Sequence, residues 1–166
     1  MADRVFNVLF LCTHNSARSV MAEAILNSIG RKRFQAFSAG SIPSGHVNPF
    51  AVEMAKSLGY TGNIHSKSWD EFTKPAAPHM DIIITVCDNA ANEACPVWPG
   101  HPATGRWGFP DPSTVNGSDD EKRKAFEQVF HAIRRRIELL VNLPVERLES
   151  LALTDELNLD SSVGRV

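Results

Sequence analysis

The chain has 166 residues, of which 43% are apolar, and this is enough for one ordinary domain with a single core. Its formal net charge is -2, with acidic and basic residues mixed along the chain, so no broad basic surface is offered to nucleic acid or to an anionic membrane. Any anion that the protein binds must therefore be held locally.

The N-terminal residues indicate a reducing compartment, in which the cysteines are then interpreted. The chain begins Met-Ala-Asp-Arg without the apolar core of a signal peptide, and no window is long enough to span a bilayer. We therefore expect a cytoplasmic protein without a membrane or nucleic-acid partner. Three cysteines, an odd number, argue there against a permanent disulfide framework and leave metal binding, redox chemistry or burial.

The first part of the chain alternates strands with helices. Residues 5–11 (VFNVLFL) are an apolar run of strand length, and apolar positions at helical spacing follow between 21 and 29. A second strand is expected at 35–38. Asn48-Pro49 then begins a helix that Gly59 ends.

The middle of the chain contains the clearest buried strand. Residues 68–71 have the pattern of a capping box for a short helix that Pro75 ends, and residues 81–86 (DIIITV) follow as an uninterrupted apolar strand. Residues 95–117 carry many of the prolines and glycines and predict a long irregular loop, with a short strand at 106–109. Loops of this length are usually functional.

A second capping box, at residues 118–121, begins the longest helix, which keeps its apolar spacing up to Pro144. We expect one domain at 1–143 and a C-terminal extension at 144–166 that is partly helical or flexible.

Strands separated by helices predict an α/β fold, a parallel sheet of about four strands with helices on both faces. In such sheets, ligands bind outside the carboxyl ends of the strands. Cys12 and Cys87 each follow a predicted strand, so two cysteines distant in sequence are expected on one rim of the sheet.

Cys12 and Arg18 are separated by five residues and lead from the first strand into a helix. A loop of this length can turn its backbone N–H groups inward, and the helix start adds further donors, which together suit a tetrahedral dianion. Arg18 can hold two oxygens of the anion, while the positive surroundings and Ser19 favour the reactive thiolate of Cys12. The predicted oxyanion site consists of Thr13, His14, Asn15, Ser16, Ala17, Arg18 and Ser19.

Plain structural roles remain alternatives for these residues. A lone cysteine at a strand end is most often a small buried apolar side chain, and a lone arginine is most often a solvated helix residue. The spacing of the two within a strand, loop and helix favours the anion site.

Asp111 lies between two prolines in Phe109-Pro110-Asp111-Pro112. Such flanks would hold its carboxyl rigidly over the anion, where it could protonate a departing oxygen. An Asp-Pro pair is by itself a common turn, so Asp111 gains weight as a general acid only from the cysteine loop.

The segments CTHNSARS at 12–19, SAG at 38–40, DIIITV at 81–86 and DPS at 111–113 together resemble the low-molecular-weight tyrosine phosphatase fold. The resemblance covers roughly residues 5–141. Within that superfamily, VCD at 86–88 and ACP at 94–96 resemble the arsenate reductases of the three-cysteine, thioredoxin-coupled type.

The resemblance implies that Cys12 attacks arsenate, that Cys87 resolves the adduct and releases arsenite, and that Cys95 then takes over Cys87. Thioredoxin is the implied reductant, with glutaredoxin or a small thiol as alternatives. Seven residues separate Cys87 from Cys95, one more than in the best-known members. Both cysteines could instead be inert, one in the core and one before Pro96.

The same resemblance implies a potassium ion near Asn15, Glu23 and Ser38, although Ser68 stands near the place of an acidic ligand. The six histidines show no ligand spacing with the cysteines, so a zinc site is not expected. His14 stands where many relatives have glycine, which predicts an unusual backbone angle there or a different loop.

Two other functions use the same residues. A tyrosine phosphatase would need Cys12, Arg18 and Asp111 but also aromatic walls, and Pro112-Ser113 stands where phosphatases of the family commonly offer an aromatic residue. A non-catalytic oxyanion-binding module would need only the loop. Neither explains the second and third cysteines.

Overall fold

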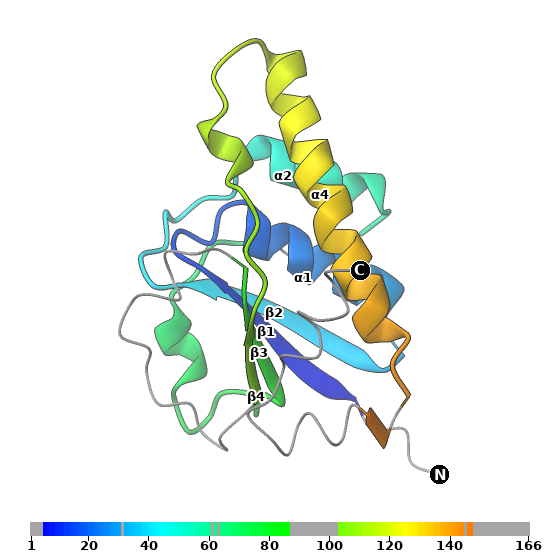
Figure 1. Ribbon diagram of the computed structural model, residues 1–166. Coiled ribbons are helices and arrows are strands. Elements are labelled where there is room, and N and C mark those ends of the chain that lie inside the picture. Colours follow the sequence, from blue (N-terminus) through cyan, green and yellow to red (C-terminus); the bar gives the residue numbers. More distant parts are fainter. Residues whose placement is uncertain are drawn as a thin grey trace.

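The computed structural model describes residues 5–30, 32–60, 62, 64–86, 103–144 and 146–147. The described residues contain a four-stranded parallel sheet with the strand order β2-β1-β3-β4 (Figure 1). Its strands are β1 Phe6–Cys12, β2 Phe34–Gly40, β3 Ile82–Thr85 and β4 Ala103–Arg106. The predicted α/β fold with a parallel sheet of about four strands is confirmed.

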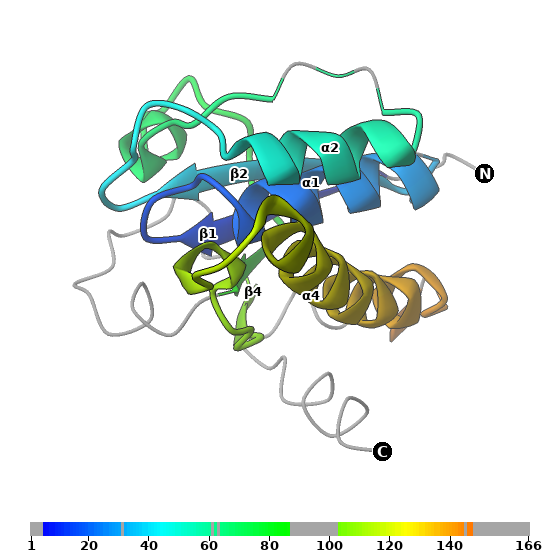
Figure 2. The ribbon, with the colours of Figure 1, turned by 90° about the horizontal axis from the view of Figure 1, so that it is seen from above.

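Three α-helices pack together on one face of the sheet. They are α1 Arg18–Ile29, α2 Pro49–Ser57 and α4 Asp119–Val141. Seen from above, α2 and α4 flank α1 (Figure 2), and α1 contacts both of them as well as β1 and β2. Because α1 is enclosed in this way, eight of its residues are buried and it lacks the one-sided apolar pattern of a surface helix.

The alternation of side chains along β1 divides the core between the two faces of the sheet. Val8 and Phe10 point to the face of the three α-helices, whereas Leu9 and Leu11 pack with the short 3-10 helix η1, Trp69–Phe72. Each fully buried large apolar side chain contributes about 1.5–3 kcal/mol by leaving water.

The helix ends follow the sequence signals closely. Asn48 caps α2 by accepting from the N–H of Phe50 at 2.9 Å, with Pro49 as the first helical residue, and Gly59 has the positive φ of 74° that lets the chain turn away. At α4, Ser118 and Glu121 form the predicted reciprocal capping box.

Two predicted elements differ from the structure. The helix after Ser68 is a single 3-10 turn, and Ser68 Oγ accepts from the N–H of Asp70 instead of Glu71. The strand expected at 106–109 is wrong in position, because β4 ends at Arg106. Pairing with β3 selects residues 103–106, and Trp107, which the predicted strand included, packs into the core instead.

No helix in the residues described is long and apolar enough to cross a membrane. Of the expected extension at 144–166, only residues 144, 146 and 147 are described, so the boundary at 143 stays a prediction.

Candidate active site

A small cavity of about 30 Å³ lies at the carboxyl end of β1, beside the buried Cys12. Here β1 lies between β2 and β3, where the strand order reverses, which is the usual place for a ligand in such sheets. The cavity is lined by Cys12, His14, Asn15, Ser16, Ala17, Arg18, Asp111 and Ser113. The structure therefore brings the predicted nucleophile, arginine and acid together with loop residues 14–17. Thr13 and Ser19, which were also predicted for the oxyanion site, are not among the residues that line the cavity.

The loop between β1 and α1 turns its carbonyl groups outward. Three of them accept hydrogen bonds from N–H groups after β2: Thr13 from Ile42 at 2.9 Å, His14 from Ser44 at 3.0 Å and Ser16 from Asn48 at 2.8 Å. No described peptide bond is cis, so the N–H that follows each carbonyl points the opposite way. The N–H groups of His14, Asn15 and Ala17, three residues that line the cavity, therefore point away from the segment after β2, an arrangement that suits an anion site.

Asn15 has the only positive φ of a non-glycine residue in the part of the chain described, at 50°. The unusual angle thus falls on Asn15 and not on His14, where the sequence placed it; asparagine tolerates this region better than most residues. Its fully buried side chain donates to Ser19 Oγ at 2.8 Å and accepts from the N–H of Lys67 at 2.9 Å. Asn15 thereby ties the loop both to α1 and to the segment before η1.

Gly40, the last residue of β2, lets the loop lie close to the sheet. A Cβ at this position would come within 2.5 Å of the Thr13 carbonyl oxygen and 3.0 Å of that of Cys12. Any larger residue would push the loop away, which explains the glycine in the SAG segment.

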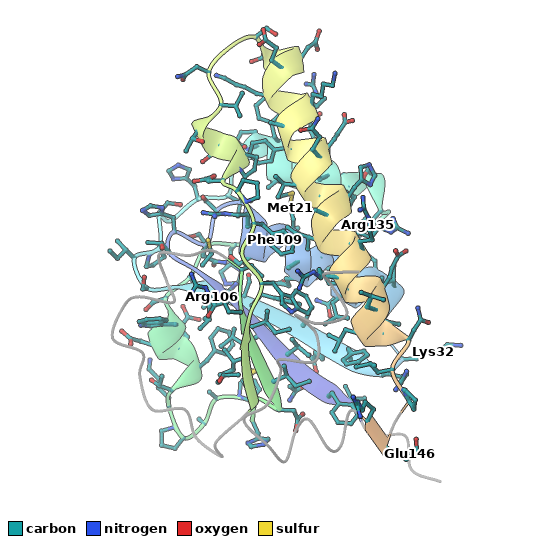
Figure 3. The ribbon with its side chains drawn as sticks, in the orientation of Figure 1. Met21, Lys32, Arg106, Phe109, Arg135 and Glu146 are labelled. Carbon is teal, nitrogen blue, oxygen red and sulfur yellow. The ribbon has the colours of Figure 1, made fainter. Side chains whose placement is uncertain are left out.

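Arg18, the first residue of α1, reaches across to the segment between β4 and η2 (Pro112–Thr114). Its Nη1 donates to the Phe109 carbonyl at 2.9 Å, and its Nη2 lies 3.5 Å from Asp111 Oδ2. Figure 3 labels Phe109 on this segment, beyond Arg106 at the end of β4. Arg18 Nε is buried and has no hydrogen-bond partner among the described residues, so this donor can serve a bound anion.

Asp111 is held in place by the start of η2. Its Oδ1 accepts from the N–H of Ser113 at 2.9 Å and from Ser113 Oγ at 2.6 Å. Because Oδ1 is engaged in this way, Oδ2 is the oxygen that lies next to Arg18, and the Asp111 side chain is 32% exposed. The carboxyl is thus oriented toward the cavity by Ser113 and the flanking prolines, a role for Ser113 that the sequence did not indicate.

A second charged cluster lies behind the loop, where Glu23 of α1, Ser38 of β2 and Lys67 meet. Burial raises the pKa of Glu23, while the hydrogen bond from Ser38 and the charge of Lys67 lower it. Burial lowers the pKa of Lys67, and the charge of Glu23 raises it. Lys67 carries no local sequence signal and was missed, because its neighbours come from two distant elements.

Cys87 and Cys95 lie outside the described residues, so the predicted relay stays a prediction. The chain enters this region beside the site, since the N–H of Val86 donates to the Leu11 carbonyl at 2.8 Å. Within the residues described, no group of three or more His, Cys, Asp or Glu side chains could hold a metal ion.

Comparison with known proteins gives a consistent result. Residues 7–152 match the model of the low molecular weight phosphotyrosine protein phosphatase family. The chain is 35% identical over 130 residues to an arsenate reductase of Halalkalibacterium halodurans, an alignment that covers 78% of this chain and 91% of that protein.

Solved structures agree. The arsenate reductase of Archaeoglobus fulgidus superposes with a TM-score of 0.64 at 29% identity, over 82% of this chain and 99% of that one. A thioredoxin-dependent arsenate reductase of Corynebacterium glutamicum has a TM-score of 0.55 at 27% identity, over 84% of this chain and 65% of that one.

Proposed function

The chain belongs to the low molecular weight phosphotyrosine protein phosphatase family and, within it, to the arsenate reductases, and from this membership we propose how its residues reduce arsenate to arsenite. Cys12 is the nucleophile, Arg18 and the loop bind the oxyanion, and Asp111 is the general acid. Cys87 and Cys95 carry the oxidation away from the site.

The cavity beside Cys12 is the observation on which this proposal depends. Its volume of about 30 Å³ suits one small tetrahedral anion, and is far below the roughly 300–1,000 Å³ of pockets for larger organic ligands. The N–H groups of the loop and the Nε of Arg18, which has no partner among the described residues, supply the donors that three anionic oxygens need.

In the first step, the Cys12 sulfur forms a bond to arsenic while one As–O bond breaks. The departing oxygen takes a proton from Asp111 and leaves as water, because a protonated oxygen is a far better leaving group. The contacts from Ser113 and the ion pair with Arg18 orient Asp111 for this transfer.

In the second step, the Cys87 thiolate attacks the Cys12 sulfur. The S–As bond breaks, its electron pair stays on arsenic, and arsenite departs from a Cys12–Cys87 disulfide. Cys95 then attacks Cys87, which restores the Cys12 thiolate and leaves a Cys87–Cys95 disulfide. Thioredoxin is the proposed reductant of that disulfide in the cytoplasm; glutaredoxin or a small thiol would do the same chemistry.

Hydrolysis of phosphotyrosine could use Cys12, Arg18 and Asp111 as well. However, no Phe, Trp or Tyr is among the described residues that line the cavity. Tyr60, the single tyrosine of the chain, lies away from the loop, with its hydroxyl 3.3 Å from Asn27 Nδ2 near the end of α1.

The test is a single-turnover experiment on Cys95→Ser with Cys12→Ser and Cys87→Ser as controls. Cys95→Ser should release one equivalent of arsenite per enzyme and then stall with a Cys12–Cys87 disulfide, identified by peptide mapping. Cys12→Ser should show only trace activity, and Cys87→Ser should give no burst with thioredoxin as the only reductant.

Full steady-state turnover of Cys95→Ser with thioredoxin would refute the relay and leave a two-cysteine or external-thiol mechanism. Turnover of phenyl phosphate without reductant, in the absence of arsenate reduction, would refute the reductase function. Arsenate binding without any consumption of reductant would indicate a sensor instead.

A further inference from the structure

Lys67 places its ammonium group among oxygens from two elements behind the oxyanion loop. Nζ donates to the backbone carbonyls of Ser38 at 2.9 Å and His65 at 2.8 Å, and it lies 3.9 Å from Glu23 Oε1. Glu23 Oε1 also accepts from Ser38 Oγ at 2.6 Å. The side chains of Lys67 and Glu23 are only 9% and 10% exposed, so this is a buried and well-coordinated cation.

The same residues were expected to bind potassium, and their geometry does not fit that ion. Asn15 Oδ1 is engaged by the N–H of Lys67, and Glu23 and Ser38 face the Lys67 ammonium group. A second cation among these oxygens would lie within a few ångströms of Nζ, where repulsion in a buried site is large. Potassium therefore could enter only if Lys67 left.

We propose that Lys67 supplies the fixed cation of the oxyanion loop and takes the place of a potassium ion, so that this enzyme works independently of potassium. Lys67 is a positioning residue, since it acts on the substrate only through the loop. The inference rests on the proposed function, because the loop that it holds is the proposed arsenate site.

The backbone of Lys67 connects this cation to the loop directly. Its N–H donates to Asn15 Oδ1, and Asn15 Nδ2 donates in turn to Ser19 Oγ at the start of α1. Its carbonyl accepts from the N–H of Gly40 at 2.9 Å, at the point where β2 passes closest to the loop. A displacement of Lys67 would therefore move Asn15, which holds the loop in its left-handed turn.

A purely structural alternative is that Lys67 only neutralises the buried Glu23. Both roles predict that removal of Lys67 is harmful, because one partner of a buried pair is left alone. Only the proposed role predicts that a potassium ion can restore the loop once the ammonium is gone. The two roles of Lys67 are therefore distinguished by whether the activity of a Lys67 variant depends on the cation of the salt. The loss of activity itself does not distinguish them.

The first experiment uses the wild-type enzyme in potassium chloride and in choline chloride at equal ionic strength, since choline is too large for the site. We expect the same kcat/KM for arsenate and the same melting temperature in both salts. A clear advantage in potassium would overturn the proposal, and no variant has to fold for this test.

The second experiment compares Lys67→Ala, which leaves room for an ion, with Lys67→Met, which fills the space without a charge. In choline both should lose roughly 10²-fold in kcat/KM, the cost of displacing a positioned group by about 1 Å. Potassium should restore much of the rate in Lys67→Ala and little in Lys67→Met. The exposed Lys74→Ala is the matched control and should behave as wild type in both salts. Equal behaviour of the two Lys67 variants in the two salts would overturn the proposal.

A readout without arsenate separates this inference from the proposed function. In a Cys87→Ser, Cys95→Ser background, iodoacetamide can alkylate only Cys12, and inorganic phosphate should protect it by occupying the loop. Protection should be cation-independent with Lys67 present, weak in Lys67→Ala in choline, and restored there by potassium. If this pattern holds while arsenate is not reduced, the function fails and the inference stands; if protection ignores the cation in every variant, the inference fails.

Discussion

Two pairs of opposite charges flank the oxyanion loop, and they are built differently. On the open side, Arg18 and Asp111 lie 3.5 Å apart with side chains 11% and 32% exposed. On the buried side, Lys67 and Glu23 lie 3.9 Å apart, and both are about one tenth exposed. The distances are similar, but the hydrogen bonding around each pair is not.

The ammonium group of Lys67 already contacts protein acceptors, whereas the guanidinium group of Arg18 still has an N–H donor that a ligand can use. Lys67 Nζ contacts two backbone carbonyls and a carboxylate, while the buried Nε of Arg18 has no partner in the part of the chain that the structure describes. An unsatisfied buried donor costs free energy unless a ligand accepts from it. The difference indicates that the inner pair holds the loop and that the outer pair acts on what the loop binds.

Asp111→Asn breaks the outer pair on its acidic side and should have the largest effect of the changes to these pairs. An amide keeps the cap to the Ser113 N–H but has no proton to give to the departing oxygen, so the first chemical step should slow roughly 10²- to 10⁴-fold. Rapid-mixing measurement of the arsenite burst at saturating arsenate tests this. Phosphate protection of Cys12 should persist, and an unchanged burst rate would place the acid elsewhere.

Arg18→Lys breaks the same pair on its basic side. A single ammonium can satisfy the Phe109 carbonyl or the anion, but it cannot reproduce the planar set of donors that Arg18 divides between Phe109, Asp111 and the cavity. We expect KM to rise and kcat to fall together, with a loss of roughly 10²- to 10³-fold in kcat/KM. Wild-type affinity for phosphate in this variant, measured by calorimetry, would contradict the proposed clamp.

The contrast between the pairs also explains what could be predicted from the sequence. Cys12 and Arg18 lie in one loop, and the strand before them and helix after them carry clear periodic patterns, so the anion site follows from local signals. Asp111 could be inferred only from its rigid Pro-Asp-Pro setting together with the cysteine loop, since its partner Arg18 lies far away in the chain. Parallel pairing of β1 with β3 and of β3 with β4 then brings the two together.

The inner pair could not be predicted, because its geometry depends on tertiary structure alone. Lys67 reaches Glu23 only after β2 pairs with β1 and Ser68 bridges to Gly40. Nothing in the sequence around Lys67 distinguishes it from a solvated lysine, and the expected potassium site omitted it. The misplaced fourth strand has the same origin, since its position is set by pairing with β3 and not by a local signal in residues 106–109.

Glu23→Gln breaks the inner pair and should have the smallest effect, seen in how stability depends on pH. Burial raises the pKa of Glu23 above its ordinary value of 4.5, so the folded protein keeps a proton that the unfolded chain has already released. The contribution of Glu23 is therefore fully present below pH 4.5 and is lost as the pH rises through the folded pKa. An amide does not titrate and can still accept from Ser38 Oγ. The stability of the variant should therefore not fall as the pH rises through this range.

Melting temperatures across this acid-to-neutral range measure the difference, at about 2–4 °C for each kcal/mol in a chain of this size. Because the amide also removes the counter-charge of Lys67, the Glu23→Gln, Lys67→Met double variant is the control. Both variants should show the same flattened profile if the Glu23 carboxyl is the source. A wild-type slope that survives in both would mean that Glu23 titrates alike in the folded and unfolded chains, so that its burial does not contribute to the pH dependence of stability.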